Sequence, residues 1–164
     1  MPERKRRIEE WLDSSRRFLL SVVEAVREED WQRVAHDDQA RWTARNVLAH
    51  VVGAELSLLG IITRAQAEGH YVPRPDFDLD FWNRRQVEKR AEKSPADLMA
   101  ELDRNRVATL KLLADLPESA LDIPVRHPSY GDMVVEDVFR LIGFHERLHA
   151  DEIRGVTAKR LSEN

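Results

Sequence analysis

The chain contains no cysteine among its 164 residues. This absence excludes disulfide bonds, thiolate ligands for a metal, and a thiol nucleophile supplied by the protein itself. Long hydrophobic runs are also missing, since no apolar stretch approaches the ~20 residues that a membrane span needs. The N-terminus is charged where a signal peptide would be apolar. We therefore predict a cytoplasmic protein that does not associate with membranes.

The chain also lacks a large excess of positive or negative charge. Lys and Arg number 26 against 30 Asp and Glu, for a net charge of −4. The basic run over residues 4–7 is followed at once by Glu9 and Glu10, which indicates a solvated helix start and not a nucleic-acid footprint. With 42% hydrophobic residues the composition is globular, and the length suits one core. We predict a single domain over residues 1–164 with no nucleic-acid partner.

Strand signals are nearly absent, and only residues 123–125 suggest an extended piece. Apolar residues recur instead at spacings of three and four, which predicts helices. Thr43 and Ser94 are expected to cap two of them, and Gly69 fits a helix C-terminus. The expected long helices cover residues 3–29, 43–68, 95–116 and 132–159. We predict an all-α four-helix bundle whose long connection between the second and third helices carries a short extra helix from about Asp80, with a loop over 117–131.

Three histidines continue the apolar stripes of the predicted helices. His145 and His149 stand four apart on the last helix, so both can reach one metal ion at roughly 2.0–2.1 Å. His50 occupies an inward position on the second helix. Buried imidazoles need partners, and three on one ion would leave a coordination position open, as in catalytic zinc sites. The alternative is three core histidines bonded to carbonyls or waters; the other histidines, at 36, 70 and 127, are expected in solvated loops.

Residues 145–149 also match the H-E-x-x-H pattern of zinc peptidases, in which the glutamate is the general base. No histidine follows His149 and no strand is evident to hold a peptide, so a peptidase is the lesser interpretation. Glu146 remains a candidate base, and a solvated or salt-bridged glutamate is the alternative.

Three segments carry a resemblance to a known family. They are Trp42 to His50, Phe81-Trp82-Asn83, and residues 145–153. In order and spacing they resemble the DinB-like superfamily, which includes the N-terminal domain of mycothiol-dependent maleylpyruvate isomerase and the bacillithiol S-transferases. The isomerase branch has a glutamate where this chain has His145, and a further C-terminal domain, so that activity is not implied.

The resemblance implies a metal triad of His50, His145 and His149 holding zinc or nickel at one end of the bundle, and a homodimer. Several members transfer a low-molecular-weight thiol to an electrophile. We therefore predict a metal-dependent transferase acting on a small molecule, with Trp82 and Asn83 lining the cofactor pocket; a packing aromatic and a capping Asn are the alternatives there. The competing functions are a hydrolase using metal-bound hydroxide with Glu146 as base, and a non-catalytic metal-binding stress-response protein.

Overall fold

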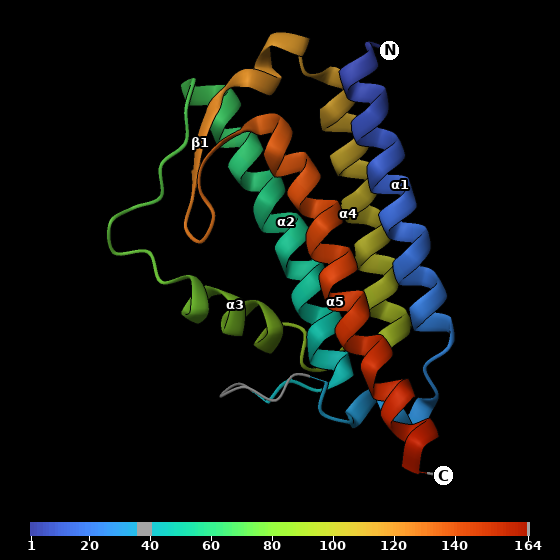
Figure 1. The fold of residues 1–164 in the computed structure, drawn as a ribbon. Coiled ribbons are helices and arrows are strands. Elements are labelled where there is room, and N and C mark those ends of the chain that lie inside the picture. Colours follow the sequence, from blue (N-terminus) through green and yellow to red (C-terminus); the bar gives the residue numbers. More distant parts are fainter. Residues whose placement is uncertain (36–40, 164) are drawn as a thin grey trace.

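Four long helices pack side by side in the computed structural model, which describes residues 1–35 and 41–163 (Figure 1). The helices are α1 (Glu3–Glu24), α2 (Ala44–Glu68), α4 (Pro95–Asp115) and α5 (Val135–Glu163). Helix α5 packs against both α1 and α2, and α2 also packs against α4. This arrangement confirms the predicted all-α four-helix bundle.

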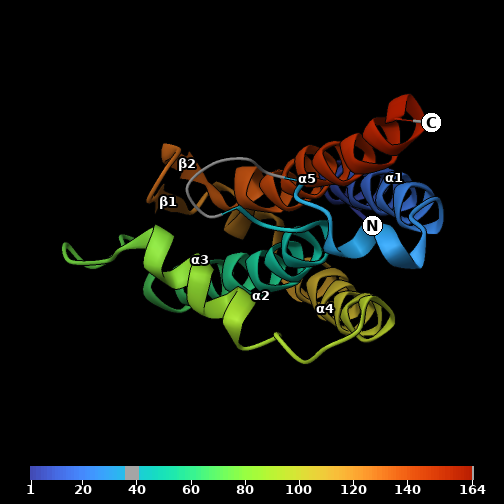
Figure 2. The same cartoon turned by 90° about the horizontal axis from the view of Figure 1, so that it is seen from below.

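The connection between α2 and α4 carries the predicted short helix, α3 (Leu79–Glu88). Figure 2 shows it outside the four long helices, beside α2. Gly53 permits this close approach, because a Cβ atom there would lie 2.8 Å from Cβ of Gln86. The position of α3 matters because it forms one wall of the cavity described below.

The predicted helix starts follow from local hydrogen bonds that satisfy the first backbone N–H groups. The Thr43 hydroxyl accepts from the N–H of Asn46, and the Ser94 hydroxyl accepts from the N–H of Asp97. Each of these third residues also bonds back to the capping residue, which completes a capping box. Gly69 follows the end of α2 in the left-handed conformation that glycine favours there. The three predicted caps are thereby confirmed.

Other boundaries differ from the prediction. The first helix ends at Glu24, and a short 3₁₀ segment, Glu28–Gln32, follows it. Residues 117–131, expected as a loop, contain a 3₁₀ turn (Glu118–Asp122) and the strand β1 (Pro124–His127). This strand pairs antiparallel with β2 (Gly131–Val134), so α5 begins at Val135 and not near Asp132. His36, which was predicted in a solvated loop, lies outside the described residues.

The β1–β2 hairpin exists because tertiary contacts supply what its short strands lack. Gly131 has a positive φ, which suits the tight turn between the strands and which other residues rarely adopt. The Tyr71 N–H donates to the Pro124 carbonyl, and the Arg126 N–H donates to the Tyr71 carbonyl. These bonds also attach the segment that follows α2 to the hairpin.

A ring of four buried charges joins the bundle helices, with one residue from each. Arg16 of α1 donates to Glu146 of α5 (2.7 Å) and to Glu55 of α2 (3.0 Å). Arg106 of α4 donates to the same two carboxylates, at 2.9 Å to Glu55 and 3.1 Å to Glu146. Burial raises the pKa of Glu55, and the two arginines oppose that rise. The ring balances its own charge and links all four helices in one register.

Helix α2 is long and apolar enough to cross a membrane by length and composition alone. It lies against α4 and α5, however, and carries the buried residues Glu55 and His50 on its inner face. Its apolar character is therefore that of the core helix of a bundle.

Candidate metal centre

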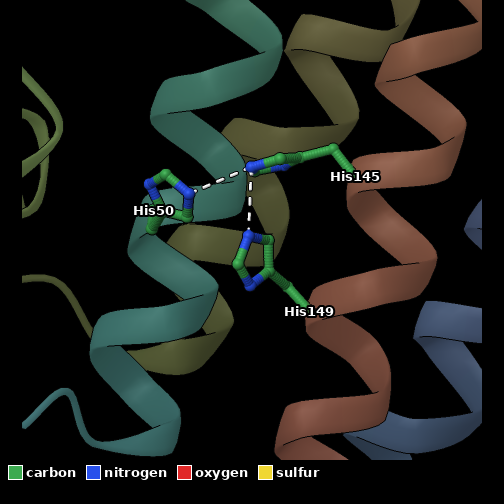
Figure 3. Close-up of side chains that lie close together, drawn as sticks. All are labelled: His50, His145 and His149. Atoms are coloured by element: carbon green, nitrogen blue, oxygen red, sulfur yellow. Dashed lines mark hydrogen bonds between the residues drawn. The ribbon is translucent and has the colours of Figure 1, made fainter. Parts of the chain in front are cut away.

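The three histidines predicted as ligands come together between α2 and α5 (Figure 3). Nε2 of His145 lies 3.0 Å from Nε2 of His50 and 3.0 Å from Nε2 of His149. His145 and His149 are one helical turn apart, and His50 faces them from the neighbouring helix. The three imidazoles from two separate helices therefore converge, as the predicted metal triad requires.

The geometry of these nitrogens fits a divalent metal ion. Tetrahedral bonds of roughly 2.1 Å place ligand nitrogens about 3.4 Å apart, close to the observed separations. Nδ1 of His149 lies 2.8 Å from a Glu152 carboxylate oxygen. Because a carboxylate only accepts, Nδ1 carries the ring proton in the neutral form and Nε2 presents its lone pair to the other two rings.

Electrostatics also favour the neutral imidazole, which is the form that binds a metal ion. Burial lowers the pKa of His145 well below its usual value, and the neighbouring imidazoles of His149 and His50 lower it further. A neutral imidazole at neutral pH has a lone pair available for a metal. The group of three histidines could therefore hold a divalent cation.

Glu152 is expected to tune metal affinity through His149. Substitution Glu152→Gln should weaken zinc binding about 10–100-fold, because the amide orients the ring less strongly and lowers its basicity. Competitive chelator titration measures the change. The neighbouring Asp151→Asn is the matched control, since Asp151 is exposed and pairs with Arg154; equal affinity in both variants would contradict the role of Glu152.

The triad opens into a cavity of about 770 Å³ bounded by α2, α3, the β1–β2 hairpin and α5. This volume lies in the range of small-molecule sites, roughly 300–1,000 Å³. Trp82 and Asn83 line it, and the Trp82 indole donates to the Ser57 hydroxyl at 2.9 Å. Both residues thus lie at the wall of the cavity beside the triad, and their contact with a cofactor or substrate stays a prediction.

Glu146, the candidate general base, is not among the residues that line the cavity. It is 1% exposed, and its carboxylate oxygens accept from Arg16 and Arg106 in the charge ring. One residue along a helix turns the side chain by about 100°, so the neighbour of His145 faces a different side. The structure shows the salt-bridged alternative, and we do not assign Glu146 a role in proton transfer.

His127 was expected in solvent, and this expectation was wrong. It is 8% exposed at the end of β1 and lines the cavity. Its Nδ1 accepts from the N–H groups of Ser129 and Tyr130, at 3.1 and 3.3 Å, so the proton of the neutral ring sits on Nε2. Burial lowers its pKa, which favours that neutral form. The extended piece expected over residues 123–125 was the sequence signal nearest to His127, and it stopped two residues short of it. His70 is exposed, as predicted.

Three solved structures share this fold. YfiT from Bacillus subtilis, described as a probable metal-dependent hydrolase with an unusual four-helix bundle topology, has a TM-score of 0.78 at 19% identity, covering 98% of this chain and 89% of its own. An uncharacterised protein from Escherichia coli UTI89 has a TM-score of 0.73 at 16% identity, covering 98% and 96%. The colibactin self-resistance protein ClbS, solved in complex with a double-stranded DNA, has a TM-score of 0.72 at 12% identity over the same shares. At these identities the likeness concerns the fold.

A search of the curated proteins finds no match. A family model described as the DinB superfamily matches residues 11–153, a span that contains all three histidines of the triad. Sequence, fold and triad agree, and this chain belongs to the DinB superfamily.

Proposed function

We propose that this protein is a metal-dependent transferase that activates a low-molecular-weight thiol for attack on a small electrophile, with zinc or nickel as its ion. The observation that carries the proposal is that the triad opens into a cavity whose described lining residues include no aspartate or glutamate. A nucleophile used there has no carboxylate among those residues to remove its proton.

This composition favours a thiol over water. A bound divalent ion supplies a Lewis acid that lowers the pKa of a thiol or water. A free thiol has a pKa of about 8.5 and has a single proton to lose. Water can also ionise at about pH 7 on such an ion, but it carries a second proton that hydrolysis must pass on, and no carboxylate among the described lining residues would take it. The chain has no cysteine, so the thiol must come from a cosubstrate.

The residues of the chain divide the remaining work. His50, His145 and His149 would hold the ion, and Glu152 orients His149 through its Nδ1. The Nε2–H of His127 is a hydrogen-bond donor on a residue that lines the cavity, suited to a developing negative charge on the electrophile. The Trp82 ring offers an apolar face to a substrate.

The direct test is turnover of an aryl halide, 1-chloro-2,4-dinitrobenzene, by zinc- or nickel-loaded protein with and without a thiol panel that includes cysteine and glutathione. In this reaction a carbon–sulfur bond forms, chloride leaves, and the thiol proton passes to solvent. We expect release of chloride above the uncatalysed rate only when thiol is present, and loss of that excess in His145→Ala.

The alternatives correspond to other outcomes. The description of YfiT as a probable metal-dependent hydrolase favours a hydrolase as the second candidate, and thiol-independent turnover of ester or amide substrates would support it over the transferase. Absence of turnover across a broad panel would favour the non-catalytic metal-binding protein. We further propose a cytoplasmic homodimer, as the family resemblance suggests; light scattering of the purified protein tests the dimer.

A further inference from the structure

The cavity beside the triad has an unusual balance of charge for this chain. Acidic residues outnumber basic ones in the sequence, 30 to 26. Among the described lining residues, however, the charged side chains are Arg64, Arg74 and Lys89, and none is acidic. Cavity walls of one sign attract ligands of the other sign.

Two of these cations interact with aromatic rings and not with carboxylates in the described part of the chain. The Arg64 guanidinium lies 5.4 Å from the centre of the Tyr71 ring, and the Lys89 ammonium lies 5.9 Å from the centre of a Trp82 ring. Arg74 is 3.9 Å from an Asp76 carboxylate, but both are exposed and such a pair contributes little.

Arg64 lies on the same face of helix α2 as the metal ligand His50, but far from it along the helix axis. His50, Ser57 and Arg64 follow each other at intervals of seven residues, so all three lie near one face of the helix. At a rise of about 1.5 Å per residue, Arg64 stands ~21 Å along the axis from His50. The cavity is therefore elongated, with the triad near one end and Arg64 at the other.

Helix α3 places the ammonium of Lys89 between the triad and Arg64. The Trp82 indole meets Ser57, and Gln86 packs on Gly53, so the chain of α3 advances along α2 in the opposite direction. The Lys89 ammonium lies 5.9 Å from the centre of a Trp82 ring, so its charge stands near the level of Ser57. Figure 1 shows α3 beside the lower half of α2. Between the two ends the lining is largely apolar, and its exposed side chains include Leu56, Trp82 and Leu148.

From these observations we infer that the cavity binds an elongated organic anion, with its apolar body against α2 and α3 and a carboxylate or phosphate group held by Arg64 at the end remote from the triad. The planar guanidinium matches both oxyanions by paired hydrogen bonds. This inference deepens the proposed function, whose cosubstrate or electrophile would be this anion. It does not require metal or turnover to be examined.

A matched pair of fluorescent probes tests it on the full-length protein, metal-free and zinc-loaded. 1-Anilinonaphthalene-8-sulfonate and N-phenyl-1-naphthylamine share one aromatic body, and only the first is an anion. We expect the wild type to bind the anion at least tenfold more tightly in both states. Arg64→Glu should abolish this preference while keeping its affinity for the neutral probe within about twofold, which also shows that the cavity is intact.

Arg104→Glu is the control, since Arg104 is exposed on α4 and is not one of the lining residues; it should leave both affinities unchanged. Displacement of the anionic probe by hexanoate or by hexyl phosphate then distinguishes the carboxylate from the phosphate. Equal binding of the two probes by the wild type, or equal effects of the two charge reversals, would overturn the inference. Thiol-dependent turnover in the absence of any anion preference would leave the proposed function standing alone.

Discussion

Replacing Glu146 by alanine is expected to destabilise the protein by about 3–5 kcal/mol, the cost of leaving buried charges without their partner. The substitution removes the carboxylate that accepts from both Arg16 and Arg106 in the interior of the bundle. Arg106 would then keep Glu55 as its one carboxylate partner, and Arg16 would keep Glu55 and the exposed Asp103. Equilibrium unfolding in urea measures the loss.

Glu146→Gln is the second variant, because it keeps the shape and one acceptor oxygen while removing the charge. It should fold and lose less stability than the alanine variant. Glu92→Ala is the control at an exposed position. A surface substitution of this kind is expected to change the free energy of unfolding by no more than about 0.5 kcal/mol. Wild-type stability of Glu146→Gln together with loss of metal would contradict the structural role and return this residue to the metal centre.

Replacing His145 by alanine is expected to remove the metal and leave the bundle folded. Nε2 of His145 is the atom that lies 3.0 Å from both other imidazoles, so its loss breaks the triad at its centre. Changing a residue that merely orients a ligand costs about 10–100-fold in metal affinity, and losing the ligand itself should cost at least as much. The metal content of the purified protein should fall toward zero. Elemental analysis of protein purified without a metal-affinity column measures the content.

Thermal unfolding supplies an independent readout of the same variant. Zinc at about one hundred times its dissociation constant should stabilise the wild type by about 2.7 kcal/mol, raising Tm by about 5–10 °C. The His145→Ala variant should show no shift at that concentration, and His149→Ala should behave alike. His70→Ala is the matched control, since His70 is exposed and is not one of the lining residues; equal metal content in His145→Ala and His70→Ala would refute the triad.

The histidine pair of α5 could be predicted because a helix imposes a fixed period. Residues four apart share a face in any helix, so the relation of His145 to His149 needs no tertiary information. The caps at Thr43 and Ser94 are equally local, since each involves a residue three positions away. Of the β1–β2 hairpin only the extended piece over residues 123–125 was expected, for the opposite reason: its strands are short, and the bonds that attach them to Tyr71 come from a distant segment.

The orientation of the Glu146 side chain shows what a sequence motif alone does not predict. The H-E-x-x-H pattern places a glutamate beside two ligands, and in a peptidase that residue is the base. Here the neighbouring helices present two arginines to it, so the same pattern produces a structural ion pair. A motif specifies spacing along one helix, whereas the environment of each side chain depends on the helices packed around it.

By itself the sequence determined the all-α class, the helix caps and the alignment of His145 with His149, because each depends on residues within one or two turns of a helix. Only the tertiary structure decided that His50 meets that pair, that Glu146 turns to Arg16 and Arg106, and that the hairpin carries His127 to the cavity wall. Those contacts join segments tens of residues apart, and they are selected by packing and charge pairing among whole helices, which local periodicity does not encode.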